Sequence, residues 1–315
     1  MDTPKAMATP AWGGRVDSEE AGDARRWHQV MQPFDAQCRD GVALIGFAVD
    51  EGVRRNGGRP GAAAGPKAIR GALANMPLLG EAPLYDAGNI VCEDGDLERA
   101  QSALGQRVAQ VIGQGLRPLV LGGGHEVAWG TFQGIAAAYR SAPRLLIMNL
   151  DAHFDLRHAE QANSGTPFHQ IRQWCVGHGW RFDYRVYGIS QYANTRALFE
   201  RAREWGVNYW LDEQMQSTQD VTALAAELQA SLDGYDAVYL TTCLDVLPGE
   251  KAPGVSAPAA LGVALPNLER LIDVVRRSEK MVAADIAELN PDKDRDGLTA
   301  RVAARIAARL AGHHA

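Results

Sequence analysis

The chain has 315 residues, of which 46% are hydrophobic and 22% charged, and its formal net charge is −6. This is ordinary globular composition, and the scattered charges exclude the basic footprint of a nucleic-acid-binding protein and the polybasic face of a membrane-binding one. Neither a signal-peptide core nor a run of the ~18 apolar residues of a membrane span is present. The four cysteines lie far apart without a C-x-x-C pattern, so we expect no disulfide framework and a location in the reducing cytoplasm.

The predicted elements begin after residues 1–40, which are rich in Pro, Gly and charge and are expected to form an irregular arm. Short apolar runs that end near Gly or Asp then alternate with amphipathic patterns. The predicted strands are residues 42–48, 117–122, 144–150, 183–189, 207–211, 236–244 and 280–286. The predicted helices are residues 96–115, 194–206, 222–232, 267–279 and 297–312.

Apolar strands that alternate with helices predict a parallel sheet that is buried on both faces. No change of composition marks a second domain. Residues 41–315 are therefore predicted to form a single α/β domain, a three-layer αβα fold with a central, mostly parallel sheet. In open sheets of this kind, ligands bind beyond the carboxyl ends of the strands. The residues that follow the strands are therefore the candidates for function.

The first polar strand end is "LVLGGGHEVAWG", where three glycines turn the chain and His125 precedes a helix. A Gly-rich turn after a strand can bind phosphate. Because neither G-x-G-x-x-G nor a Lys-Ser/Thr pair is present, a nucleotide site is a weak interpretation. Two others remain open: a tight turn with a capping histidine, or a turn that lets His125 approach a bound group.

The second strand end, "NLDAHFDLR", places Asp151, His153 and Asp155 at alternate positions. In a strand, such side chains point the same way. Three polar groups that face an apolar interior are costly unless they are paired or bind metal. Carboxylate and imidazole are ligands that divalent Mn, Fe and Zn accept. The pattern favours a metal site, and the alternative is a solvated loop with chance alternation.

The third and fourth strand ends also carry polar groups. Cys243 and Asp245 have the same two-residue spacing and precede a Pro/Gly-rich loop of the kind that is often functional. A small buried thiol and a capping carboxylate are the alternatives. Glu288, after the last strand, is either a solvated loop acid or a ligand for a cationic substrate. Gathered at one edge, these groups could hold two divalent ions that activate water.

The chain resembles the ureohydrolase (arginase/agmatinase) family. Its Gly-Gly-His turn, "DAHFD", "TTCLD" with "APGVSAP", and "DIAE" occur in the family's order over about residues 40–312. The resemblance implies an arginase-like fold and hydrolysis of C–N bonds of guanidino or amidino compounds at a two-manganese centre. Residues 54–70 and 164–171 are similar to the branch that acts in histidine degradation. This implies that a hydroxide bridging two Mn²⁺ per subunit converts N-formimidoyl-L-glutamate to L-glutamate and formamide.

Position by position, the resemblance implies metal ligands at His125, Asp151, His153, Asp155, Cys243 and Asp245. Asp151 would bridge the metals, Asp155 would pass a proton to the departing nitrogen, and Glu288 would hold the amidine. Cys243 stands where the family has a second bridging Asp. Because a thiolate is a softer ligand, another divalent metal is an alternative to Mn²⁺. Ser164 replaces a His that is frequent in members with guanidino substrates, which argues against agmatine and arginine.

The two carboxylates of such a substrate need cations, and Arg54, Arg55, Arg59 and Arg157 lie near the motifs. Spacing does not decide among them; we expect Arg157 and Ser164 to contact the substrate. The resemblance also implies a homo-oligomer. Three alternatives remain open: another guanidino- or amidino-acid hydrolase, a metal-depleted family member without activity, and a nucleotide-binding protein that is indifferent to chelators.

Overall fold

The computed structural model describes residues 11–314, which contain one nine-stranded, all-parallel sheet. The strand order is β1-β3-β2-β4-β9-β8-β5-β6-β7. All seven predicted strands are present: β2 (Val42–Ala48), β4 (Arg117–Leu121), β5 (Leu145–Leu150), β6 (Asp183–Ile189), β7 (Asn208–Leu211), β8 (Ala237–Cys243) and β9 (Met281–Ala287). Two strands were not predicted, β3 (Leu84–Val91) and the short edge strand β1 (Gln32–Pro33).

The five predicted helices are also present: α4 (Leu97–Gly113), α7 (Arg196–Glu204), α8 (Thr218–Ser231), α9 (Leu265–Arg277) and α10 (Leu298–Ala311). The helix expected directly after His125, for which no end was predicted, is α5 (Val127–Ala138). Four more helices were not predicted: α1 (Trp27–Val30), α2 (Glu51–Arg55), α3 (Gly65–Ala74) and α6 (Pro167–His178). Short 3₁₀ turns are η1 (Ala62–Ala64), η2 (Asp212–Met215), η3 (Leu232–Gly234), η4 (Leu244–Val246) and η5 (Pro291–Lys293). The extent of helix α5 could not be predicted, because the helix is buried nearly all round and has no polar stripe.

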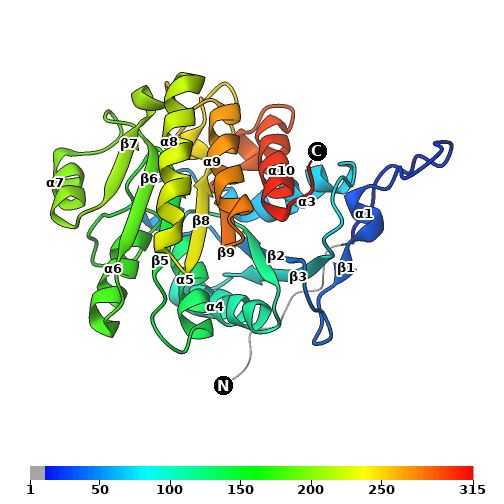
Figure 1. The fold of residues 1–315 in the computed structure, drawn as a ribbon, viewed down its shortest axis with the longest axis horizontal. Coiled ribbons are helices and arrows are strands. Elements are labelled where there is room, and N and C mark those ends of the chain that lie inside the picture. The colour runs from blue at the N-terminus through cyan, green and yellow to red at the C-terminus, as the bar shows by residue number, and fades with distance from the viewer. Residues whose placement is uncertain (1–10, 315) are drawn as a thin grey trace.

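Helices cover both faces of the sheet (Figure 1): α3, α8, α9 and α10 lie on one face, and α4, α5 and α6 lie on the other. Strand β5 shows why both faces of the sheet are covered. Its residues Leu146, Met148 and Leu150 pack into the first core, whereas Leu145 and Ile147 pack into the second. Burial of such a side chain contributes roughly 1.5–3 kcal/mol, so strands that are apolar on both faces require two helical layers. The predicted three-layer αβα fold is confirmed.

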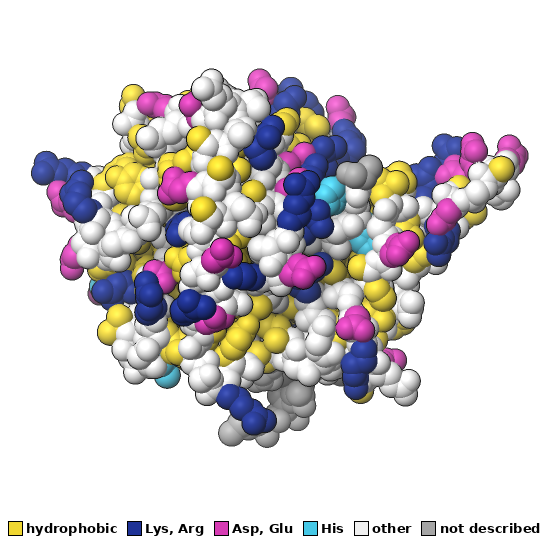
Figure 2. Space-filling model, viewed as in Figure 1, with side chains coloured by type: hydrophobic (Ala, Val, Ile, Leu, Met, Phe, Trp, Pro, Cys, Tyr) yellow, Lys and Arg dark blue, Asp and Glu magenta, His cyan; other side chains and the backbone are white. Residues whose placement is uncertain are grey.

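Residues 1–10 of the predicted arm, and Ala315, lie outside the described residues. Part of the segment before α1 extends away from the body of the molecule (Figure 1). The indole Nε1 of Trp12 ties this segment back through a 2.8 Å hydrogen bond to Oδ2 of Asp86. Basic and acidic side chains are interspersed over the face that Figure 2 shows, including this extension.

The last helix, α10, covers the sheet. It packs against α3 and α9, and its alanines Ala303 and Ala307 are fully buried. Two of its arginines, Arg305 and Arg309, turn toward α9, where Nη1 of Arg309 lies 2.8 Å from Oδ2 of Asp273. Among residues 11–314, no helix has both the length and the apolar character that crossing a membrane requires.

Strands β4, β9, β8 and β5 are consecutive in the middle of the sheet. They are also the four strands whose carboxyl ends carry the polar residues singled out above. Because all four run parallel, their ends meet at one edge, where ligands bind in open α/β sheets.

Candidate metal centre

The glycine turn after β4 carries His125 to the edge of the sheet. The N–H of Gly123 donates a 2.7 Å hydrogen bond to the carbonyl of Phe47, and the N–H of Gly124 donates one of 3.0 Å to Val49. A Cβ on Gly123 would lie 1.7 Å from the oxygen of Val49. Only glycine allows the turn to approach the backbone of the segment at Phe47 and Val49 so closely.

Strand β5 ends at Leu150, so Asp151, His153 and Asp155 lie in the loop that follows it. The structure brings the three side chains together, but strand alternation is not the reason. The backbone of Asp155 has a φ of 49°, in the left-handed region that a non-glycine residue seldom adopts. This turn returns the Asp155 carboxylate to the cluster.

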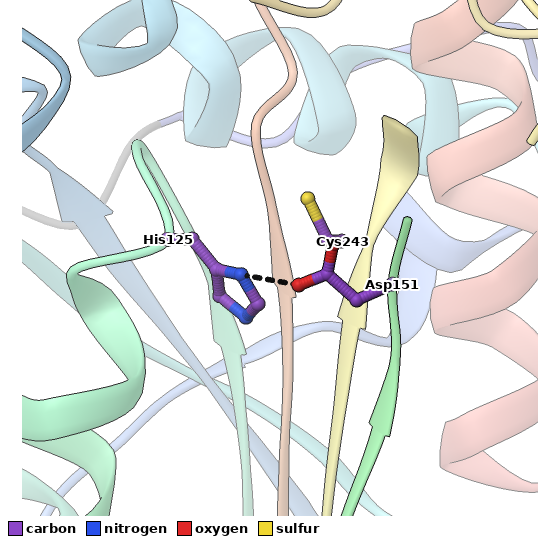
Figure 3. A group of neighbouring side chains, drawn as sticks. All are labelled: His125, Asp151 and Cys243. Carbon is purple, nitrogen blue, oxygen red and sulfur yellow. Dashed lines mark ion pairs between the residues drawn. The ribbon is translucent and has the colours of Figure 1, made fainter. Parts of the chain in front are cut away.

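One group of possible ligands consists of His125, Asp151 and Cys243, which point toward one another (Figure 3). One ligand atom from each lies within 4.8 Å of the others. Nδ1 of His125 is 3.0 Å from Oδ2 of Asp151 and 2.9 Å from Oδ2 of Asp155. All of these residues except Asp155 are fully buried.

A second group consists of Asp151, His153 and Asp245. Nδ1 of His153 lies 3.2 Å from Oδ2 of Asp245 and 3.6 Å from Oδ1 of Asp151. Asp151 belongs to both groups and offers a different carboxylate oxygen to each histidine. Its carboxylate is held by Nδ2 of Asn149 at 2.9 Å and by the N–H of His153 at 2.7 Å.

The geometry of these groups fits metal ions. Nε2 of His125 lies 3.0 Å from the hydroxyl of Thr241, whereas its Nδ1 lies at ion-pair distance from the carboxylates of Asp151 and Asp155 without the geometry of a hydrogen bond among the described residues. Oδ1 of Asp245 is likewise buried without a partner among them. Two ligand atoms that sit about 2.1 Å from one octahedral ion, at right angles, lie about 3 Å apart. The nitrogen–oxygen distances around His125 match that spacing.

The electrostatics of the cluster also favour cations. Burial by itself lowers the pKa of His125, but the carboxylates of Asp151 and Asp155 raise it well above its usual value. Burial raises the pKa of Asp155, as does the charge of Asp151. Burial and the charge of Asp151 also raise the pKa of the Cys243 thiol. The site therefore holds crowded negative groups whose charge a bound cation would offset.

Glu288 lies beside this cluster, directly after β9. Its backbone has a φ of 74°, and its N–H donates a 2.8 Å hydrogen bond to the carbonyl of Gly123. Burial raises the pKa of its carboxyl to about 8, helped by the nearby acids Glu126 and Asp245. Strained backbone that its surroundings hold in place is common at functional sites.

A cavity of about 280 Å³ opens over the cluster. It is lined by His125, His153, Asp155, Cys243, Asp245 and Glu288 from the strand ends, and by Arg157, Ser164, Asn56, Gly57, Gly58, Arg59, Ser256 and Ala257 from the surrounding loops. Of the four arginines that the sequence left open, Arg59 and Arg157 line the cavity. Asp285 does not line it; its Oδ2 accepts a 2.5 Å hydrogen bond from the hydroxyl of Tyr239 inside the core.

Sequence reasoning missed three polar residues of the site. Thr241 precedes Cys243 by two positions, and Asn149 precedes Asp151 by two, so strand alternation could have found both. Asn56 had no such signal, because it follows α2 and no strand; it lines the cavity, and its Nδ2 donates a 3.1 Å hydrogen bond to the hydroxyl of Ser164.

Comparisons with known proteins show the family to which the chain belongs. The sequence profile of the arginase family matches residues 40–312. The chain is 53% identical over 314 residues to the formimidoylglutamase of Cupriavidus pinatubonensis, which covers 98% of this chain and 99% of that one. The formimidoylglutamase of Bacillus subtilis has a similar fold, with a TM-score of 0.81 over 95% of this chain and 96% of that one, at 22% identity. A Trypanosoma cruzi formiminoglutamase solved with Mn²⁺ has a TM-score of 0.80 over 92% and 98% of the two chains, at 25% identity.

Proposed function

This chain belongs to the arginase family, and on that premise we propose that it hydrolyses N-formimidoyl-L-glutamate to L-glutamate and formamide. Relatives named formimidoylglutamase that are about half identical over nearly the full length support this activity. One structural observation carries the proposal. The buried carboxylate of Glu288 lines the same cavity as His125, His153, Cys243 and Asp245, which belong to two groups of possible metal ligands, and Arg59 and Arg157 also line it.

Two divalent ions fit the site. His125, Asp155 and Cys243 would hold one ion, His153 and Asp245 would hold the other, and Asp151 would contact both. We propose Mn²⁺, because a similar structure was solved with that ion, and because the cluster is rich in carboxylate and imidazole donors: His125 and His153 lie beside Asp151, and they also lie beside Asp155 and Asp245, respectively. Such a pair of ions supplies a water-derived nucleophile near neutral pH.

Glu288 binds the protonated amidine. An amidinium carries a delocalised positive charge and planar N–H donors, which suit a carboxylate acceptor. Burial raises the pKa of Glu288 to about 8, and the charge of the bound amidinium lowers it again, so the carboxylate ionises as the substrate arrives. This contact places the formimidoyl carbon over the ligand cluster.

Asp155 moves the proton. Its carboxylate lines the cavity, and burial together with the charge of Asp151 raises its pKa. It accepts a proton from the attacking water and delivers it to the substrate nitrogen as the C–N bond breaks, so that L-glutamate leaves as an amine. A positioned general acid–base of this kind contributes typically 10²–10⁴-fold.

Arg157 and Ser164 contact the glutamate portion of the substrate. Both line the cavity, and the N–H of Arg157 donates a 2.9 Å hydrogen bond to the carbonyl of Gly165, next to Ser164.

The described cysteines are all free thiols, which supports a cytoplasmic location. We also propose a homo-oligomer, as the family resemblance implies, and analytical ultracentrifugation tests this.

The activity is tested with purified protein loaded with Mn²⁺. Formamide release from N-formimidoyl-L-glutamate is compared with urea release from agmatine, arginine and 4-guanidinobutyrate. We expect the formimidoyl substrate to have a kcat/KM at least about 100-fold above the others. Faster urea release would identify a guanidino-acid hydrolase. A metal-loaded protein that acts on none of them would be a family member without activity.

A further inference from the structure

Two of the four candidate arginines are neutralised outside the cavity. Nε of Arg54 lies 2.6 Å from Oε2 of Glu51. Nη1 of Arg55 lies 2.7 Å from Oε1 of Glu98, and its Nε is 3.0 Å from Glu51. Neither arginine lines the cavity. Their charges are already matched by carboxylates, so they have little to offer a substrate.

Arg59 is different, because only neutral groups hold it. Its Nε donates a 2.8 Å hydrogen bond to the carbonyl of Ser256, and its Nη2 donates one of 2.5 Å to the carbonyl of Val255. Its own N–H donates to the hydroxyl of Ser256 at 2.9 Å. Among residues 11–314, no carboxylate lies within ion-pair distance of its guanidinium. The side chain is therefore fixed in direction while its charge remains uncompensated.

The segment 56–59 lines the cavity and is hydrogen-bonded to two of the loops that surround it. At one end, Asn56 is hydrogen-bonded to Ser164, in the loop that follows β5. At the other end, Arg59 is bonded to Ser256, in the loop that follows β8. Arg157 adjoins the first of these walls, because its backbone is bonded to Gly165. Arg157, like Arg59, has no ion-pair partner within residues 11–314, and the two arginines line the cavity from different walls.

The substrate has two carboxylates at unequal distances from the bond that breaks. The α-carboxylate is on the carbon that carries the departing nitrogen, and the side-chain carboxylate lies beyond two further methylene groups. Arg157 follows Asp155 by two residues, so its Cα lies within about 7 Å of that of Asp155. Because Asp155 is proposed to act on the bond that breaks, Arg157 is suited to bind the α-carboxylate, which is the carboxylate nearer to that bond.

We propose that Arg59 binds the distal, side-chain carboxylate of the substrate and so determines the preference for a dicarboxylate, while Arg157 binds the α-carboxylate. This inference rests on the proposed function. A guanidinium that two carbonyls already orient loses little rotational freedom when it pairs with a carboxylate. Arg59 is a specificity-determining residue in this proposal, and it takes no part in the chemical step.

The test measures a preference within each variant. Its substrates are N-formimidoyl-L-glutamate, N-formimidoyl-L-2-aminobutyrate, which lacks the distal carboxylate, and N-formimidoyl-4-aminobutyrate, which lacks the α-carboxylate. In Arg59→Met we expect the kcat/KM ratio of the first substrate to the second to fall at least about 30-fold. In Arg157→Met we expect the ratio of the first to the third to fall instead. Arg54→Met, the control, should keep both wild-type ratios.

Because each ratio is taken within one variant, a loss of folded protein cancels. Arg59→Lys, which keeps the charge, should recover part of the lost preference. An unchanged first ratio in Arg59→Met, or a fall of the other ratio instead, overturns the inference.

Calorimetry with L-glutamate and L-2-aminobutyrate tests Arg59 without turnover, and Arg59→Met should weaken binding of L-glutamate selectively. Wild-type protein that binds L-glutamate with this dependence on Arg59 but releases no formamide would refute the proposed function alone.

Discussion

The backbone N–H of His125 donates a 3.0 Å hydrogen bond to Oε1 of Glu288, although 163 residues separate them in the chain. The two follow neighbouring strands, β4 and β9. The carboxylate that we propose to hold the amidine is thus fixed by the backbone of a proposed metal ligand. The position of the substrate and the position of the metal ions depend on the same glycine turn.

Glu288→Gln separates charge from geometry, because an amide oxygen can still accept the bond from His125. We expect kcat/KM for N-formimidoyl-L-glutamate to fall about 100-fold or more, since hydrogen bonds to charged groups contribute about 1.5–3 kcal/mol each. Metal content and Tm should stay near those of the wild type. Steady-state kinetics and elemental analysis check this. Glu250→Gln, at an exposed loop position, is the matched control, and equal losses in both variants would contradict the assignment.

Asp151→Asn should reduce turnover by at least about 10³-fold. An amide cannot offer two anionic oxygens to two ions. One of its faces is also an NH₂ group, which would meet either the donor of Asn149 or that of His153. A buried donor without an acceptor costs about 1–3 kcal/mol, so Tm should also drop by a few degrees. Formamide assays and thermal melting measure the two effects, and substantial turnover with bound metal would show that Asp151 is not a bridging ligand.

Cys243→Asp places a carboxylate where the family resemblance implies one. Mn²⁺ prefers oxygen ligands to thiolate, so we expect this variant to bind Mn²⁺ about tenfold more tightly than the wild type. Tighter binding should also increase the rise of Tm that added Mn²⁺ produces. Cys92→Ser, which alters a thiol outside the site, should behave like the wild type. Identical Mn²⁺ titrations of Cys243→Asp and the wild type would remove Cys243 from the ligand set.

Asp86→Asn should destabilise the fold without changing the catalytic activity of the folded protein. The carboxylate of Asp86 is buried and accepts two 2.9 Å bonds from Arg70. Removing one partner of a buried ion pair costs about 3–5 kcal/mol. Denaturant titration should show that loss in the free energy of unfolding, with a near-normal kcat/KM per folded molecule. Asp236→Asn, which breaks an exposed pair with Arg144, should leave the denaturation midpoint almost unchanged.

Features of the fold that depend on neighbouring residues could be predicted from the sequence, whereas features that depend on contacts between distant residues could not. Seven strands follow from short apolar runs and five helices follow from amphipathic patterns, and both signals depend only on neighbours in the chain. The edge at which the site lies also follows, because parallel strands place their carboxyl ends together. Strand β3 could not be predicted, since "LYDAGNIV" reads as a broken run until Arg70 is seen to neutralise Asp86.

The sequence by itself determined which residue types stand at the ends of β4, β5, β8 and β9, and therefore the kind of chemistry. Only the tertiary structure decided that a left-handed turn, and not a strand, returns Asp155 to the cluster. It also decided that Arg59 and Arg157 face the cavity, whereas Glu51 and Glu98 hold Arg54 and Arg55 away from it. The direction of a long charged side chain depends on which opposite charges and carbonyls the fold brings within reach, and sequence spacing does not contain that information.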